Sequence, residues 1–496
     1  MQYPLCAPHP SASARSSTCR SSLVAGSLHA EDLLRVRPPD WPRSLWAEER
    51  RHLDVPVADL SCTFDVAIVG AGYTGLWSAV LLAELRPDLA ILVIDASEPG
   101  FGASGRNGGW CSGLFPVDIE SLGHRHGHGE ALAMQRAAID TVDDIGRWIA
   151  RHSIDCDWAK SGTLTVATNS VQETRLCDEI ERQHRQGLDE SDVRWIDRDT
   201  LADRVKVAGA RGASYSPHCA AIHPLKLVNG LVDRARALGV GFVSGFTVEA
   251  IDSTGVSGRT KDRPLHVKAN WVVRATEGYT PRLRGAGRDV IPLYSYMVAT
   301  EPLPDDTWRD IGWGARETLA EGRLMVTYAQ RTADGRIAFG GRGAGYRYAS
   351  RINGRFDTDQ SVARRIVATM HELFPATRDA RITHHWGGPL AVPRDWHPAV
   401  TIDHTTRRIT AGGYVGDGVA MSHLAGRTVA AAIAGIDSPD LRLAFVNHRG
   451  RRWEPEPLRW IGVNAGLRLP VITDAVEARS GRPAKRLGKM IDRLLG

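Results

Sequence analysis

The sequence has little of what marks disulfide-bonded, metal-binding or nucleic-acid-binding proteins. Its seven cysteines are scattered, without a CxxC pair or a metal-ligand spacing, and this predicts free thiols, a reducing cytoplasmic location and no metal site. The net charge is only +5, and residues 449–496, with eleven Lys or Arg against five Asp or Glu, account for the whole excess. The rest of the chain is close to neutral, which argues against a nucleic-acid partner.

Long apolar segments are also scarce. Only residues 66–83 are uncharged over a length that could cross a bilayer, and the glycines in the first third of this segment argue against a membrane span. Residues 1–30 have no acidic residue and no apolar core of a secretory signal. We expect residues 1–40 to form a disordered extension rather than an organelle transit peptide, with ordered structure beginning near residues 41–50.

The sequence does contain a strand, a glycine-rich turn, a helix and a second strand near its start. An apolar strand precedes the pattern Gly70-x-Gly72-x-x-Gly75, and the next apolar strand ends at Asp95. Gly70 permits a tight turn, Gly72 lets a pyrophosphate approach the backbone, and Gly75 allows close packing of helix on strand. The helix N-terminus offers N–H groups to phosphates, and a carboxylate at the position of Asp95 binds ribose hydroxyls. The segment therefore predicts a dinucleotide site.

Hydrophobic periodicity predicts helices and strands in the rest of the chain. Helices are expected at residues 131–152, 172–186, 222–239, 359–373 and 420–433, and a loop at 100–129. Strands are expected at 162–167, 240–251, 265–275 and 408–412, and those at 290–300, 336–341 and 382–392 alternate as in a mixed or antiparallel sheet. The chain thus returns to a glycine-rich strand, turn and helix near its C-terminus, after a β-rich middle part.

Six segments carry a family likeness. Between residues 64 and 436 they follow in the order GAGYTGLWSA, GFGASGRNGGW, AAIHPLKLVNGLVDRARALGV, VVRATEGYTPRL, IPLYSYMVATEPL and GGYVGDGVAMSHLAGRTVA. The sequence resembles the D-amino-acid-oxidase-like flavoproteins, and among them the branch of γ-glutamylputrescine oxidoreductase. This resemblance implies an α/β (α+β) fold, in which a Rossmann-like, DAO-type FAD-binding domain carries an antiparallel, β-rich substrate cap. The FAD-binding domain is expected at 64–115, 215–280 and 380–436, the cap at 116–214 and 281–379, and a helical extension at 437–496.

The resemblance also implies which residues hold the FAD. Gly70, Gly72 and Gly75 should contact the pyrophosphate, and Asp95 the adenosine ribose. The ribityl chain and isoalloxazine should lie along Gly102, Ala103, Ser104, Gly105, Arg106, Asn107 and Gly108. Val248 should meet the adenine through its backbone, Ala275 and Thr276 should cover the phosphates, and N–H groups for the pyrimidine end of the flavin should come from Gly413, Gly416, Asp417, Gly418 and Val419. A helix N-terminus there would stabilise the negative charge of reduced flavin.

Two departures from the family pattern bear on the chemistry. Relatives that bind FAD covalently carry a cysteine shortly before the C-terminal glycine-rich turn, whereas no cysteine follows Cys219 here. Non-covalent FAD is therefore expected. Sarcosine oxidases use an oxygen-activating lysine at a position that corresponds by eye to Arg336, so either an oxidase or a dehydrogenase is possible.

The expected reaction is hydride transfer from the carbon bearing an amine or amino-acid nitrogen to flavin N5, giving an imine and then an aldehyde or keto product. Such a site needs positioning and exclusion of water more than acid–base groups, so no catalytic residue is assigned. Candidate substrate anchors that could equally fill the core are Tyr294, Tyr296, Tyr328, Arg342 and His385. Oxygen or another carrier would accept the electrons, and the oligomeric state is left open. The alternatives are an aromatic-hydroxylase-type flavin monooxygenase and a non-catalytic flavin-binding subunit.

Three further features are assigned no role in the reaction. The segment HRHGHG, with His124, His126 and His128, is interpreted as a solvated loop rather than a metal site, because no Cys or carboxylate partners stand at matching spacing. Cys111 is interpreted as a buried, inert thiol. A C-terminal apolar stripe is expected to pack on the protein or on a partner rather than on a membrane; it consists of Leu487, Met490, Ile491, Leu494 and Leu495.

Overall fold

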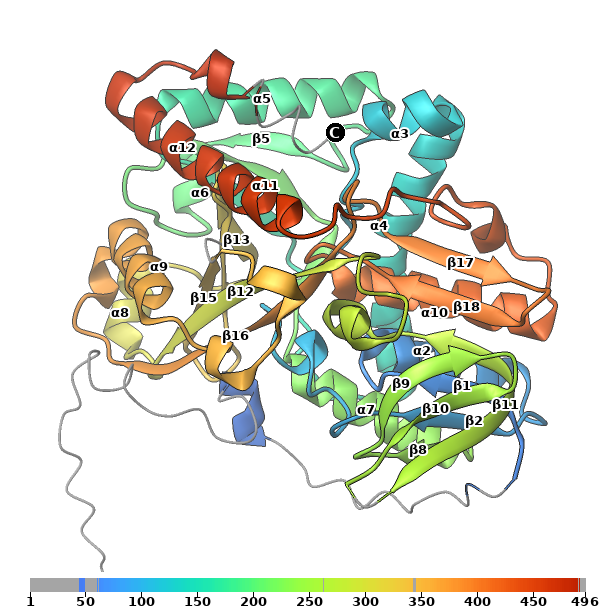
Figure 1. The fold of residues 1–496 in the computed structure, drawn as a ribbon. Helices are drawn as coiled ribbons and strands as arrows, with labels where there is room; N and C mark the ends of the chain where they lie inside the picture. Colours follow the sequence, from blue (N-terminus) through green and yellow to red (C-terminus); the bar gives the residue numbers. More distant parts are fainter. Residues whose placement is uncertain are drawn as a thin grey trace, which may run out of the picture.

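The computed structural model describes residues 44–49, 60, 62–261, 263–341, 345–488 and 490. The extension predicted at 1–40, the candidate anchor Arg342 and most of the C-terminal apolar stripe lie outside these residues. The described chain forms two eight-stranded sheets and a two-stranded ribbon. Figure 1 shows the first sheet on the right and the second towards the left.

The first sheet has a parallel core. In the order β17-β18-β11-β1-β2-β8, only β17 and β18 are antiparallel neighbours. The hairpin of β9 and β10 is joined to β11. Parallel strands are covered on both faces, and accordingly β2 consists only of buried Ile, Leu and Val. The strand bounds are β1 (Phe64–Val69), β2 (Ile91–Ile94), β8 (Gly241–Val243), β9 (Thr247–Asp252), β10 (Gly255–Arg259), β11 (Pro264–Arg274), β17 (Ala399–Asp403) and β18 (Arg408–Gly412).

The two helices that follow the glycine-rich turns pack directly on each other. They are α2 (Tyr73–Leu85) and α10 (Gly418–Ala434). At Gly426 an added Cβ would lie 2.8 Å from the Cβ of Trp77, so a larger residue there would push the helices apart. Trp77 is fully buried, with its ring 4.6 Å from that of His423 in α10. The packing of α2 on α10 therefore holds the two glycine-rich turns that precede these helices at a fixed separation.

The second sheet is largely antiparallel and forms its own apolar core. Its order is β16-β12-β15-β14-β13-β4-β6-β5, and only β13 and β4 run parallel. The ribbon pairs β3 with β7. The bounds are β3 (Trp110–Ser112), β4 (Thr163–Ala167), β5 (Arg194–Asp197), β6 (Gly212–Ser216), β7 (Cys219–Ala221), β12 (Ile291–Thr300), β13 (Thr318–Glu321), β14 (Thr327–Arg331), β15 (Ile337–Gly341) and β16 (Ile382–Val392).

Helices cover both sheets. The C-terminal helix α12 is joined to α5 by an ion pair of 2.7 Å between Arg175 and Glu477, and Figure 1 shows the two helices near each other at the top. The other bounds are α3 (Ile119–His126), α4 (His128–Arg151), α5 (Ser170–Arg185), α6 (Arg198–Ala202), α7 (Pro224–Ala237), α8 (Asp305–Ile311), α9 (Gln360–Leu373), α11 (Leu458–Gly466) and α12 (Arg468–Ser480). Short 3-10 turns are η1 (Leu45–Glu49), η2 (Ala103–Gly105), η3 (Glu277–Arg282), η4 (Tyr348–Ser350), η5 (Gly354–Phe356), η6 (Pro375–Thr377) and η7 (Pro439–Arg442).

The prediction of a loop at 100–129 is wrong. This segment contains η2, β3 and the whole of α3, and α4 begins at His128. The predicted strand 240–251 is divided between β8, which pairs with β2, and β9, which pairs with β10. Strand β16 falls within the segment 380–436 assigned to the flavin domain, yet it pairs with β12 in the second sheet. Within the part of the chain that is described, no helix is both long and apolar enough for a membrane span.

Candidate flavin site

The first glycine turn is closed on all sides by backbone. Gly70 has φ +112°, and a Cβ at this residue would clash with the carbonyl oxygen of Ala275. At Gly75 a Cβ would clash with the carbonyl of Gly70, and at Gly72 it would lie 2.9 Å from Ser104 Oγ. The turn therefore fits only glycine at its first and third positions. It packs on Ala275, whose predicted contact with the phosphates stays a prediction.

Asp95 lies beside this turn at the end of β2. Its Oδ2 accepts a hydrogen bond of 2.7 Å from the N–H of Ala71, and its Oδ1 accepts one of 2.8 Å from the N–H of Ser97. Burial nevertheless raises the pKa of Asp95 to about 6. Each carboxylate oxygen has a second lone pair for a donor such as a sugar hydroxyl. The geometry thus fits the role in ribose binding that the sequence predicts.

The loop of residues 102–108 lies over the N-terminus of α2. Ser104 Oγ accepts a hydrogen bond of 2.9 Å from the N–H of Tyr73, in the first turn of that helix. Asn107 holds the loop itself: its Nδ2 donates to the carbonyls of Ala103 and Ser104, and its Oδ1 accepts from Gly109. The loop is therefore fixed by its own side chains.

Arg106 anchors the loop to the second sheet. Its guanidinium forms an ion pair of 3.0 Å with Asp357 and donates to the Tyr279 hydroxyl at 2.7 Å and to the carbonyl of Gly387 at 3.1 Å. The side chain is 1% exposed. Because these partners take up its charge and donors, Arg106 positions the loop.

The N-terminal turn η1 supports the other side of this loop. Trp46, which is 2% exposed, donates from Nε1 to the carbonyl of Asn107 at 2.8 Å, and Ser44 Oγ donates to the carbonyl of Gly105 at 3.2 Å. The order expected near residues 41–50 thus includes a direct support for the flavin loop. Sequence reasoning did not assign Trp46 to the site.

Glu277 joins the second glycine turn to the end of β11. Its Oε1 accepts hydrogen bonds of 2.9 Å from the N–H of Gly413 and 3.3 Å from that of Tyr414, and its Oε2 accepts one of 3.2 Å from Ala391. Burial raises the pKa of Glu277 to about 7. Sequence reasoning missed this residue, and the N–H of Gly413 is directed to it instead of to a ligand.

The remaining residues of the second turn lead into α10. Gly416 has φ +122° and Val415 has φ +59°. The first N–H groups of a helix have no partner inside the helix, so Gly418 and Val419 present donors and partial positive charge at the turn. Tyr414 ties this turn to α2 through a hydrogen bond of 3.0 Å between its hydroxyl and Thr74 Oγ1.

Two adjoining cavities lie at the flavin loop and the second glycine turn, and the smaller one also reaches the start of α2. A small one of about 60 Å³ is lined by Tyr73 and Thr74 of α2, by the flavin loop and by Gly416, Gly418 and Val419. A larger one of about 430 Å³ shares part of this lining and extends under the second sheet. The larger cavity reaches Arg106, Gly108 and Asp417. The two cavities share the predicted residues Ala103, Asn107, Gly416 and Val419, whereas Gly102 and Gly105 of the predicted set 102–108 line neither of them. The contacts of these residues with FAD stay a prediction.

The other predicted flavin contacts line neither cavity, and Val248 and Thr276 are among them. Val248 is buried in β9, and Phe246, two positions earlier, donates its N–H to the carbonyl of Asp95 at 3.0 Å. The hydroxyls of Thr276 and Thr280 are 2.8 Å apart. Both positions lie next to residues of the first turn, and their contacts with the cofactor stay a prediction.

Of the candidate substrate anchors that the structure describes, only Tyr328 lines the larger cavity. Its hydroxyl lies 2.8 Å from Ser295 Oγ, and its ring is packed where a Cβ on Gly108 would lie, 2.7 Å from Cε2. Tyr294 and Tyr296 lie on one face of β12 with their rings stacked at 6.0 Å in the core of the second sheet. His385 Nε2 accepts from the N–H of Asp359, and burial lowers its pKa to about 4.

Arg336 lines neither of these cavities. Its guanidinium bonds to Asp334 at 2.7 Å, to the carbonyl of Thr300 at 3.1 Å and to Thr383 Oγ1 at 3.1 Å. Its match to the lysine of sarcosine oxidases stays a prediction. The buried Gln330 of β14 contacts the flavin loop, because it donates to the carbonyl of Gly108 at 2.8 Å.

Comparisons with known proteins agree with this geometry. Residues 65–432 match the family model DAO, described as FAD dependent oxidoreductase. γ-Glutamylputrescine oxidoreductase of Escherichia coli is 31% identical over 398 residues, which are 78% of this chain and 88% of that protein. The probable oxidoreductase OrdL of Haemophilus influenzae is 29% identical over 392 residues, or 75% of this chain and 83% of that one.

The fold is shared with solved structures as well. Glycine oxidase from Geobacillus kaustophilus superposes with a TM-score of 0.65 at 19% identity, covering 78% of this chain and 100% of that chain. The first glycine turn, the loop over α2 and the joined cavities fit an FAD. The family confirms the prediction that FAD is the cofactor. The chain therefore belongs to the DAO family of FAD-dependent oxidoreductases.

Proposed function

We propose that this enzyme oxidises a C–N bond of an amine whose remaining part carries hydrogen-bonding groups. The observation that carries the proposal is the cavity of about 430 Å³, which extends from the flavin loop and the second glycine turn to the strands of the second sheet. The chemistry that FAD supplies when bound is hydride acceptance from the carbon that bears the nitrogen. The resulting imine then takes up water and gives a carbonyl compound and a free amine or ammonia.

The lining of this cavity suits a chain with hydrogen-bonding groups. Uncharged polar side chains make up much of it: Gln135, Thr163, Thr165, Gln183, Ser214, Ser216 and Ser295. Hydroxyl and amide groups both donate and accept, so they can follow amide or hydroxyl groups along a substrate. Trp110, Leu114 and Ile139 provide apolar surface between them and displace water from the reacting carbon.

Two charged residues in the lining, Arg106 and Asp192, are already paired. Arg106 is held by Asp357, as described above. Asp192 accepts a hydrogen bond of 2.6 Å from Arg136 and lies 3.1 Å from His218 Nε2. A substrate carboxylate is best bound by a guanidinium that is available for two parallel hydrogen bonds, and the described lining offers none. We therefore favour an amine over an α-amino acid.

Positioning accounts for most of what the chain must contribute. The substrate nitrogen has to be neutral and its C–H has to face the flavin, which the walls of the cavity can enforce without an acid–base pair. The hydroxyl pair of Tyr328 and Ser295 lies beside Gly108, close to the flavin loop. We assign these two side chains to orienting the substrate.

Anaerobic reduction of the bound flavin tests the proposal. The purified protein is mixed in the absence of oxygen with polyamines, γ-glutamylated amines, N-methyl amino acids and D-amino acids, and bleaching of the flavin absorption is followed. The form of each compound in which every amine nitrogen is acylated is the matched control, because it lacks any basic nitrogen. We expect polyamines to bleach the flavin and their fully acylated forms to leave it oxidised.

Two results would contradict the proposal. Flavin that no amine reduces, together with NADPH consumption stimulated by phenols, would favour a monooxygenase. Flavin that stays oxidised with every donor would favour a subunit without turnover. After reduction, the rates of reoxidation by air and by an artificial dye separate an oxidase from a dehydrogenase.

A further inference from the structure

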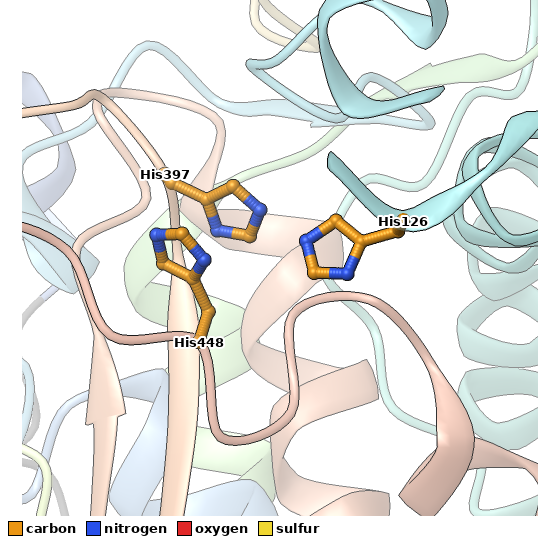
Figure 2. Close-up of side chains that lie close together, drawn as sticks. All are labelled: His126, His397 and His448. Atoms are coloured by element: carbon orange, nitrogen blue, oxygen red, sulfur yellow. The ribbon is translucent and has the colours of Figure 1, made fainter. Parts of the chain in front are cut away.

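Three histidines from distant parts of the sequence meet outside the flavin site. His126 ends α3, His397 lies between β16 and β17, and His448 follows η7. One ring nitrogen of each lies within 4.8 Å of one nitrogen of both others. Figure 2 shows the three rings around a common gap, with a nitrogen of each ring on the edge that faces it. The segment HRHGHG, interpreted above as a solvated loop, therefore contributes one residue to a defined cluster.

His397 has a buried nitrogen that lacks a hydrogen-bond partner. The residue is 1% exposed, and its Nδ1 lies 2.7 Å from the carbonyl oxygen of Pro398. A carbonyl only accepts, so Nδ1 carries the proton and Nε2 has a free lone pair. In the described part of the chain, nothing forms a hydrogen bond with this buried Nε2. An unsatisfied buried polar atom is costly, and a metal ion would satisfy it.

His448 is oriented in the same manner by a carboxylate. Its Nε2 lies 2.7 Å from Oδ2 of Asp395, so Nε2–H donates and Nδ1 has the lone pair. Its ring is stacked on that of His397, with centroids 3.7 Å apart and 17° between planes.

His126 closes the cluster from the solvent side. It is exposed, and its ring centroid lies 6.3 Å from those of both His397 and His448. Metal-bound histidines usually donate their other N–H to a backbone carbonyl or a carboxylate, and this is the arrangement at His397 and His448. A tetrahedral ion with bonds of about 2.0–2.1 Å needs ligand nitrogens about 3.3 Å apart, so the three side chains would have to rotate from their present separation of up to 4.8 Å to bind it.

We propose that His126, His397 and His448 bind one divalent late transition-metal ion such as Zn²⁺, with water in the remaining position. Imidazole ligands suit these ions. The ion would connect α3 to two loops of the opposite end of the chain. His397 and His448 also line a cavity of about 420 Å³ whose wall includes Glu277 and Gly413. The proposal concerns metal binding and is independent of the substrate of the enzyme.

Metal binding to the FAD-loaded enzyme tests the proposal. The protein is prepared without a polyhistidine tag and treated with a chelator, and Zn²⁺ affinity is measured by competition with a chromogenic chelator. The main variant is His126→Gln, because this exposed side chain can be replaced without disturbing the core. The matched control is His124→Gln, which changes an exposed histidine two positions earlier in the same helix. Asp395→Asn removes the carboxylate that orients His448.

We expect one Zn²⁺ per wild-type chain and the same for His124→Gln. The affinity should fall at least about tenfold in His126→Gln and about 10- to 100-fold in Asp395→Asn. With Cu²⁺ as the probe, electron paramagnetic resonance should show nitrogen coupling that is reduced in His126→Gln. No retained Zn²⁺ in the wild type, or equal affinity in His126→Gln and His124→Gln, would overturn the proposal.

Discussion

At Gly70 a single methyl group decides whether the first turn can form. The residue has φ +112°, and a Cβ would clash with the carbonyl oxygen of Ala275. We expect Gly70→Ala to cost about 1–3 kcal/mol of folding free energy and to lower FAD content. The control is Gly129→Ala, where an added Cβ meets nothing within 4 Å. The ratio of flavin to protein absorption and a chemical unfolding curve measure both effects, and equal FAD content in the two variants would contradict the role of this turn.

We expect the Tyr328 side chain to orient the substrate in the cavity. Its ring packs on Gly108, whereas its hydroxyl bonds to Ser295. Tyr328→Phe keeps the ring, so FAD content should be unchanged, while loss of one hydrogen bond should lower kcat/KM for the best amine about 2- to 12-fold. Tyr348→Phe, at a tyrosine that is 47% exposed, serves as the control. A fall in FAD content with unchanged kcat/KM would mean that Tyr328 supports the loop and does not orient the substrate.

At the scale of elements, Glu277 couples the end of β11 to the turn before α10. Its pKa in the folded protein is raised by burial to about 7, above the value of about 4.3 in an unfolded chain. The folded state therefore holds this proton more tightly, so the free energy of unfolding should fall as pH rises from about 4.3 to about 7. Gln at this position does not titrate.

The comparison of wild type with Glu277→Gln isolates this contribution. The pKa of Asp95 is also raised, to about 6. Its ionisation therefore lowers the free energy of unfolding over an overlapping pH range in both proteins. We expect the wild type to lose about 1–3 kcal/mol more than Glu277→Gln between pH 5 and pH 7.5. Denaturant unfolding of the flavin-free proteins at several pH values measures the difference. Parallel profiles would mean that Glu277 is ionised throughout this range.

The elements that could be predicted are those with local signals. The bounds of β2, β16 and β18 agree with the predicted 91–94, 382–392 and 408–412, because an apolar or alternating run marks each of them. Helix α3 was missed because HRHGHG has no hydrophobic period. Its start does carry a local signal, since Asp118 caps the helix by accepting from the N–H of Ser121 at 2.8 Å.

The supports of the candidate site could not be predicted in the same way. Glu277 bonds to residues 114 to 137 positions away, and Trp46 bonds to a carbonyl 61 positions away. No local pattern records such contacts. The glycine turns were predictable because their function constrains the backbone itself. The resemblance did not reveal which side chains already form hydrogen bonds with the N–H of Gly413 or with the guanidinium of Arg106.

At the scale of the molecule, the binding of one ligand should stabilise segments from both ends of the chain. Thr74 and Tyr414, which join α2 to the second turn, are 340 positions apart. A ligand that binds only the folded state stabilises it by about 2.7 kcal/mol at a concentration about 100-fold above its Kd. We expect FAD to contact both turns and AMP only the first one, so FAD should bind more tightly and raise the thermal unfolding midpoint more than AMP at the same ligand concentration. Gly70→Ala should require more FAD than Gly129→Ala for the same shift. If AMP stabilised the protein as much as FAD at equal concentration, the second turn would contribute nothing to cofactor binding.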